Sequence, residues 1–113
     1  MNELNKSALN YHFTNNWFSP HKIVWGELLA KFNPTKILEV GSYEGASSCF
    51  LVEKLACEKE IELHCIDSWK GGIEHQSGGM AEADMSVVEL RFKHNIKLAK
   101  QSVTHSVSLQ VHK

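Results

Sequence analysis

Apolar positions along the chain alternate between short, nearly continuous runs and stretches with a helical period. The runs predict strands at Lys36–Val40, Ile61–Ile66 and Val103–Val111. The periodic stretches between them predict helices at Ala46–Cys57 and at about Met80–Lys100. Since each strand is followed by a helix and then by another strand, the pattern is typical of a parallel sheet with helical crossovers.

Another helix is predicted before the first strand. It begins at Ser19, a good N-cap that a proline follows, and it ends at Asn33, where a second proline follows. Its spacing predicts that Ile23, Leu28 and Phe32 face inward. The first strand is apolar at nearly every position, which is typical of a strand that is buried on both faces.

The predicted fold class is α/β, a Rossmann-like three-layer α/β/α arrangement. Right-handed crossovers place the strands in the order 3-2-1, and the parallel sheet is truncated after about three strands. A chain of 113 residues with 42% hydrophobic residues can form one small core. Residues 1–18 are predicted to form an N-terminal segment, and residues 19–113 the domain.

The bulk composition excludes several classes of protein. The net charge of -1, without a basic stripe, argues against a nucleic-acid partner. No apolar run approaches the ~20 residues of a membrane span, and the N-terminus lacks the apolar segment of a signal peptide. None of the three cysteines forms a C-x-x-C pair with another. Their odd number and their apolar neighbours suggest reduced, buried thiols. We therefore expect a cytoplasmic protein with neither membrane nor nucleic-acid partners.

The seven histidines are scattered, and no two of them are spaced to share one helix face as metal ligands. The sequence therefore predicts no metal site. His75 lies in a glycine-rich loop that follows the second predicted strand, where a general base or a substrate contact is conceivable. A role in stabilising the loop is at least as plausible for this histidine.

The first predicted strand runs into a turn with two glycines, Gly41 and Gly45, and it carries an acid, Glu39, near its end. Ligands of open parallel sheets bind beyond the carboxyl ends of the strands, where glycines let them approach the backbone. A dinucleotide fingerprint needs glycine at the position of Tyr43, and a P-loop needs lysine at the position of Ala46. This turn therefore suits a ligand with a carboxylate and an ammonium group better than a phosphate.

A second acid, Asp67, ends the second predicted strand. In this architecture an acid at that place faces a ribose and accepts hydrogen bonds from its hydroxyls. Trp69 could stack on an adenine or simply pack under the loop. An amino-acid end, a ribose and an adenine together describe S-adenosylmethionine.

These motifs carry a family resemblance. The stretches ILEVGSYEGASS, HCIDSWKGGIEH and VVELRFKHNI resemble a class I S-adenosylmethionine-dependent methyltransferase, of the small-molecule type with a D-x-[WF]-x-G-G-x-E-H loop. WFSPHKIVW is similar to the segment before the first strand in that group, so the resemblance covers about residues 11–113. The family sheet has seven strands in the order 3-2-1-4-5-7-6, so the resemblance covers an N-terminal half.

The resemblance implies an S-adenosylmethionine site and O-methylation of a small molecule. The implied cofactor-binding residues are Glu39, Gly41, Ser42, Gly45, Asp67, Ser68 and Trp69. The catalytic residues are unknown, with His75 as a weak candidate, because the strands that usually meet the acceptor are missing. The first strand then has an open apolar edge, which we expect to cause self-association or low stability, or to accept a complementing chain.

Two alternatives stay open. The chain could be a non-catalytic remnant that keeps the fold and serves as a binding or interaction module. It could also be a fragment of a nucleotide-dependent oxidoreductase with an unusual turn, although Tyr43 argues against that function.

Overall fold

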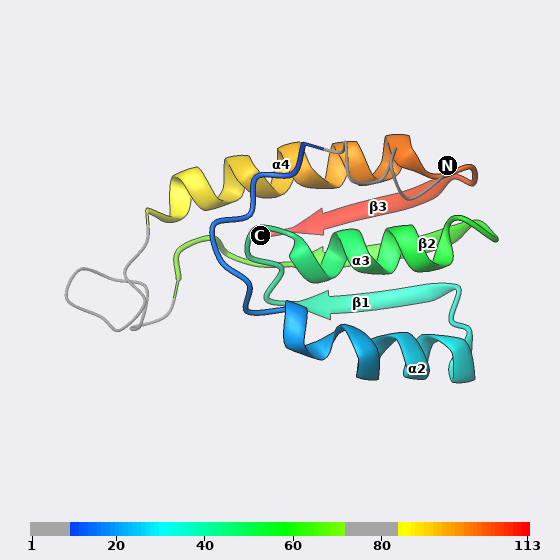
Figure 1. Ribbon diagram of the computed structural model, residues 1–113. Coiled ribbons are helices and arrows are strands. Elements are labelled where there is room, and N and C mark those ends of the chain that lie inside the picture. The colour runs from blue at the N-terminus through cyan, green and yellow to red at the C-terminus, as the bar shows by residue number, and fades with distance from the viewer. Residues whose placement is uncertain (1–9, 72–83) are drawn as a thin grey trace.

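A computed structural model describes residues 10–71 and 84–113 of the chain. The elements in order are η1 (Ser19–His21), α2 (Lys22–Phe32), β1 (Lys36–Val40), α3 (Ala46–Leu55), β2 (Ile61–Ile66), α4 (Met85–Ser102) and β3 (Val107–His112) (Figure 1). The three strands form one parallel sheet in the order β1-β2-β3, which confirms the predicted mixed α/β class, strand direction and strand order.

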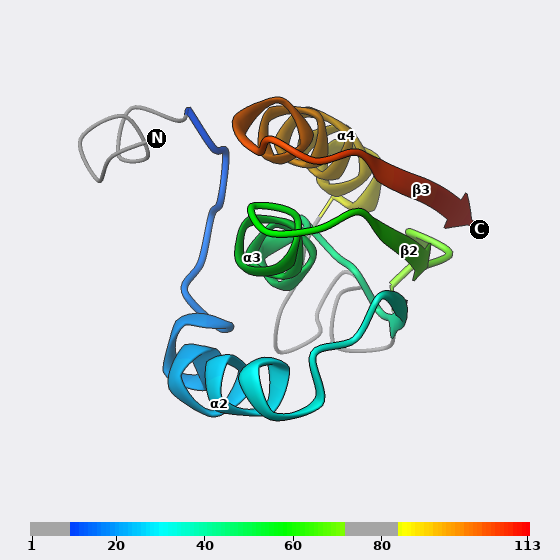
Figure 2. The same ribbon diagram turned by 90° about the vertical axis from the view of Figure 1, so that its right-hand side faces the viewer.

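The described helices lie on one face of the sheet (Figure 2). On that face, β2 contributes the buried side chains of Ile61, Leu63 and Cys65. α3 and α4 cover them, with Val52 and Phe92 among the largest fully buried side chains. The core is thus a single layer of apolar side chains between the sheet and its crossover helices.

β1 alternates instead of being buried on both faces. Glu39 is buried, whereas the side chains of Leu38 and Val40 are 62% and 75% exposed. The prediction of burial on both faces is therefore wrong for the described residues, because no described helix covers the face to which Leu38 and Val40 point.

The inward face of α2 also differs from the prediction. Ile23, Leu28 and Phe32 are exposed, and Trp25 and Leu29 pack against the core instead. The reason is that α2 lies beyond β1 rather than over the middle of the sheet, so only one edge of the helix meets α3 (Figure 2). An apolar period shows that a helix has apolar faces, but not which neighbours cover them.

Several boundaries differ from the predicted ones by a few residues, and Ser19 is the first residue of η1 rather than a side-chain N-cap. α4 begins at Met85, because Asp84 is extended and its side chain caps the helix by accepting a hydrogen bond from the Ser86 N–H. α4 runs through Ser102, so β3 begins at Val107 rather than at Val103. α3 ends at Leu55, two residues before the predicted end at Cys57.

Residues 10–18, here called the strap, have no helix or strand of their own. They run from α4 across the end of α3 to α2, on the side where the strands end (Figure 1). None of the helices in the described ranges is both long and apolar enough to cross a membrane.

The three cysteines provide a test of this core. Cys49 and Cys65 are buried, and burial raises the pKa of both thiols, whereas Cys57 is exposed. Because the thiolate is the reactive form, we expect a thiol reagent at pH 8 to label Cys57 rapidly and the other two only on unfolding. A Cys57→Ser variant should then show no fast labelling. Fast labelling of two or more thiols in the native protein would contradict this core.

Candidate functional site

The loop between β1 and α3 has the backbone that the glycine spacing predicts. Gly41 and Gly45 have φ angles of 82° and 86°, in the left-handed region that favours glycine. Tyr43 adopts a φ of 51° between them, so the chain reverses within a few residues. Gly45 is the N-cap of α3, whose first amides point beyond the end of the sheet.

Asp67 joins this turn to the end of β2. Its Oδ2 accepts a hydrogen bond of 2.9 Å from the Tyr43 N–H, and its Oδ1 accepts one of 2.8 Å from the Trp69 N–H. The two loops that the sequence analysis singled out therefore meet at the carboxyl ends of β1 and β2. Each carboxylate oxygen has two lone pairs, so the side chain keeps acceptor capacity beyond these bonds.

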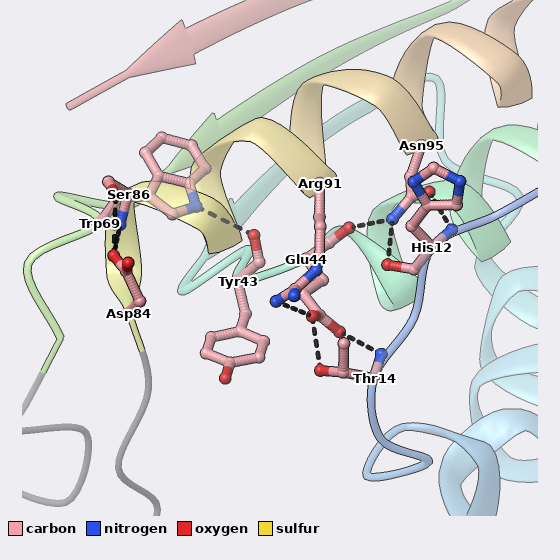
Figure 3. Close-up of polar contacts among 9 residues, drawn as sticks. All are labelled: His12, Thr14, Tyr43, Glu44, Trp69, Asp84, Ser86, Arg91 and Asn95. Atoms are coloured by element: carbon pink, nitrogen blue, oxygen red, sulfur yellow. Dashed lines mark hydrogen bonds and ion pairs between the residues drawn. The ribbon is translucent and has the colours of Figure 1, made fainter.

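Trp69 lies in the core rather than over an open site. Only 5% of it is exposed, and its ring packs on Phe92 with the centroids 4.9 Å apart. The indole N–H donates to the Tyr43 carbonyl at 2.9 Å, as Figure 3 shows. Of the two roles considered for Trp69, the structure shows packing under the loop. Stacking on an adenine would require the ring to leave Phe92.

Glu39 faces the helices and anchors the start of α3. It is 7% exposed, and its two carboxylate oxygens accept hydrogen bonds from the hydroxyls of Ser47 and Ser48. Both bonds keep a negative charge close to the first turn of the helix, which the helix dipole favours. The expected contact of Glu39 with an ammonium group stays a prediction. Because both carboxylate oxygens already bond to these serines, an ammonium group would have to share them with the serine hydroxyls.

The two serines of the predicted site differ in environment. Ser42 is buried, and its hydroxyl has no hydrogen-bond partner among the described residues. It lies close enough to Cys65 to oppose the rise in the pKa of that thiol, although the two groups form no hydrogen bond of good geometry. Ser68 is exposed, and its hydroxyl accepts a bond from the Lys70 N–H at 3.2 Å. His75 lies outside the described residues.

A buried carboxylate in the turn, Glu44, was not predicted as a site residue. It is 2% exposed and accepts hydrogen bonds from the N–H of Thr14 at 2.9 Å and from its hydroxyl at 2.6 Å. Arg91 of α4 supplies the counter-charge, with Nη1 3.3 Å from Glu44 Oε2 (Figure 3). A charge at this depth is tolerated only when it is paired and hydrogen-bonded, so strap, turn and α4 have to be in place together.

Asn95 of α4 completes this connection. It is fully buried, and its Nδ2 donates to the Glu44 carbonyl at 2.9 Å and to the His12 carbonyl at 3.2 Å. Its Oδ1 accepts the His12 N–H at 2.7 Å. His12 also stacks on His94, with the ring centroids 3.9 Å apart. The Asn95 side chain thus bonds to both the N–H and the carbonyl of His12, as the backbone of a neighbouring strand would.

Sequence reasoning missed Glu44, Asn95, Arg91 and Thr14 for a common reason. Each is a polar residue in a segment where exposed polar residues are ordinary. The only sequence signal is that Asn95 falls within the predicted apolar stripe of α4, one position before Ile96. A polar residue at such a place indicates a buried hydrogen-bonding role.

The arrangement provides three chemical features at one edge of the sheet. The turn exposes left-handed backbone at Gly41, α3 presents its N-terminal amides, and Asp67 presents a carboxylate close to the turn. Helix amides favour an anionic group, and the carboxylate favours hydroxyl or cationic donors. Among the described residues, no group of three or more His, Cys, Asp or Glu side chains is placed to hold a metal ion.

Comparison of the chain with protein-family models, with curated proteins and with solved structures finds no match.

The two glycines of the turn differ in a way that can be measured. A Cβ at Gly45 would lie 3.1 Å from Phe92 Cδ1, whereas a Cβ at Gly41 would meet nothing within 4 Å. Gly41→Ala should therefore cost only the left-handed strain, about 1–2 kcal/mol of unfolding free energy. Gly45→Ala adds overpacking of about 1–3 kcal/mol. Urea denaturation should rank the variants in this order, and equal losses would contradict the close contact of Gly45 with Phe92.

The bonds of Asn95 to the strap lead to a second prediction. Asn95→Ala leaves the half-buried His12 N–H and the buried Glu44 carbonyl without this partner, so we expect a loss of about 2 kcal/mol in unfolding free energy. We also expect limited proteolysis to cut within residues 10–18 much faster than in the wild type. Asn15→Ala is the matched control, since within residues 10–71 and 84–113 the Asn15 side chain accepts a bond from the exposed Trp17 N–H and holds no buried group. Equal cleavage of the two variants would argue against this anchoring.

Proposed function

We propose that the chain binds S-adenosylmethionine and belongs to an S-adenosylmethionine-dependent methyltransferase that methylates a hydroxyl of a small molecule. The observation that carries the proposal is the meeting of the Gly41–Gly45 turn with Asp67, through the hydrogen bond from the Tyr43 N–H. An acid after β2 beside a glycine turn after β1 is the arrangement that recognises a nucleoside in doubly wound sheets.

The kind of nucleoside follows from the turn. Tyr43 stands where a pyrophosphate would need glycine, and the turn contains no lysine to neutralise phosphates. The first amides of α3 suit a carboxylate, and the buried carboxylate of Glu39 favours a cationic ligand over a polyanion. S-adenosylmethionine carries a carboxylate, an ammonium and a sulfonium, and it has no phosphate.

The chain's own groups have a positioning role in the proposed reaction. Methyl transfer from a sulfonium is a direct displacement, so its rate depends on the alignment of the acceptor oxygen with the methyl group and the sulfur. The turn and Asp67 would fix the cofactor, and the network around Glu44 would keep the turn rigid. The proposal assigns the described residues cofactor binding alone.

Isothermal titration with S-adenosylhomocysteine, the demethylated product, tests this proposal. Asp67→Asn removes the charged acceptor but keeps an oxygen for the Tyr43 N–H, so we expect binding to weaken about tenfold or more. Asp84→Asn is the matched control, because Asp84 caps α4 at an exposed position and should leave the affinity unchanged. Circular dichroism checks that both variants are folded.

Two outcomes separate the alternatives. Tighter binding of a nicotinamide dinucleotide than of S-adenosylhomocysteine would favour the oxidoreductase fragment. No heat with either ligand would leave a non-catalytic binding module and reject the cofactor site.

We also propose that the open edge of β1 recruits another strand. The Thr35 carbonyl and the Gly41 N–H bond to β2, so by alternation the backbone groups of Lys36, Leu38 and Val40 point to the open side. An apolar groove of about 380 Å³ between α2 and β1 adjoins this edge. Further elements over the exposed face would supply the third layer of a Rossmann-like fold.

This edge should make the isolated chain associate. We expect the weight-average mass in analytical ultracentrifugation to rise with concentration, and Val40→Lys to reduce this rise because a charge on an edge strand opposes pairing. Leu90→Lys, at an exposed apolar position of α4, is the control and should have little effect. A monomer at every concentration, with high thermal stability, would contradict the proposal.

A further inference from the structure

A pocket lies between the strap and the face of α3 that points away from the sheet (Figure 2). Its volume is about 120 Å³, and it is partly open to solvent. The strap contributes the side chains of Tyr11, Phe13 and Phe18, and α3 contributes those of Cys49, Phe50 and Glu53. Neither Tyr43 nor Asp67 is among the described residues that line it, so this strap pocket is separate from the proposed cofactor site.

Aromatic rings form much of the wall of the strap pocket. Tyr11 and Phe13 stack with their centroids 5.0 Å apart, and Phe18 meets Phe50 edge to face at 5.3 Å. Rings in these different orientations offer both faces and edges, which are the contacts that a further aromatic ring prefers. A cavity of about 150 Å³ holds benzene in another protein, so a pocket of about 120 Å³ with an open side has room for one six-membered ring.

Glu53 gives the strap pocket its negative charge. Its side chain is half-buried, and Oε2 accepts a hydrogen bond from the Tyr11 hydroxyl at 3.1 Å, which leaves acceptor capacity on both carboxylate oxygens. Burial raises the pKa of the Tyr11 phenol and of the Cys49 thiol, and the charge of Glu53 raises both further. The phenol and the thiol are therefore neutral at physiological pH, and the carboxylate is the group that a cation would meet.

We propose that the strap pocket binds an arylalkyl ammonium ion, whose ring lies between the strap and α3 and whose ammonium group pairs with Glu53. The aromatic side chains supply the apolar surface, and a carboxylate that has lost part of its hydration forms charge-assisted hydrogen bonds with an ammonium group. Aromatic faces attract the same cation. Benzylammonium is a small member of this class and serves as the probe.

Lys22 of α2 is a second charged residue of the lining, with the opposite sign. Its side chain is exposed and long enough to turn toward solvent when a cation binds. Lys22→Gln removes a like charge, so it should strengthen the binding of benzylammonium several-fold. If the pocket selected anions instead, the same variant would weaken binding, and that outcome would overturn the proposal.

A ligand in this pocket would hold the strap on α3. It contacts both segments, so it binds only the chain whose strap is docked and shifts the chain toward that state. Benzylammonium at ten times its dissociation constant should therefore slow limited proteolysis within residues 10–18 of the parent chain about tenfold. Cleavage at an unchanged rate would contradict this position of the ligand.

Isothermal titration calorimetry tests the proposal with three probes of similar size, namely benzylammonium, neutral benzyl alcohol and anionic benzoate. Benzylammonium should bind about tenfold or more tightly than the other two. Glu53→Gln keeps an acceptor for the Tyr11 hydroxyl but removes the charge, so it should weaken the binding of benzylammonium about tenfold. Glu58→Gln, at an exposed acid that follows α3, is the matched control and should bind as the parent does. Undiminished binding by Glu53→Gln, or tighter binding of either other probe, would overturn the proposal.

A second measurement covers the case in which a variant does not fold. In the parent chain, benzylammonium should shift the ring resonances of Phe18 and Phe50 and leave those of Phe32, which is exposed on α2, unchanged. Shifts that miss Phe18 and Phe50, or the absence of any saturable shift, would overturn the proposal.

Discussion

The buried charge of Glu44 is the constraint on which the ligand edge of this protein depends. A carboxylate that is 2% exposed loses nearly all of its hydration, and among the described residues the bonds from Thr14 and Arg91 compensate for that loss. Thr14 belongs to the strap, Arg91 to α4, and Glu44 to the glycine turn. The shape of the turn is therefore determined by residues 30 and 47 positions away as well as by its own glycines.

Much of the backbone was predictable, because local patterns determine it. β1 and β2 have the predicted bounds, Lys36–Val40 and Ile61–Ile66, and the parallel order follows from the helical crossovers. The meeting of Gly41 and Gly45 with Asp67 was also predictable, since the carboxyl ends of neighbouring parallel strands lie at one edge. These predictions need only the period of apolar residues and the conformational freedom of glycine.

The remaining features depend on which side chains meet, and single positions carry little information on that. Trp69 is buried because Phe92, 23 positions later, faces it, and Phe32 is exposed because α2 extends past the sheet. His64 and His112 are adjacent through the register of β2 with β3, although their separation of 48 residues has no meaning in the sequence. Polar pairs of this kind become visible only when the strands are aligned.

The strap has a consequence for the order in which the molecule can assemble. His12 leaves the ribosome before its partner Asn95, which follows 83 positions later. Closing so long a loop is entropically costly, and α4 has to exist before the strap can dock. The strap is thus synthesised before α4 and docks after α4 has formed. During that interval the face of α3 that carries Phe50 and Glu53, which Phe18 and Tyr11 of the strap contact, stays open to solvent or to a chaperone.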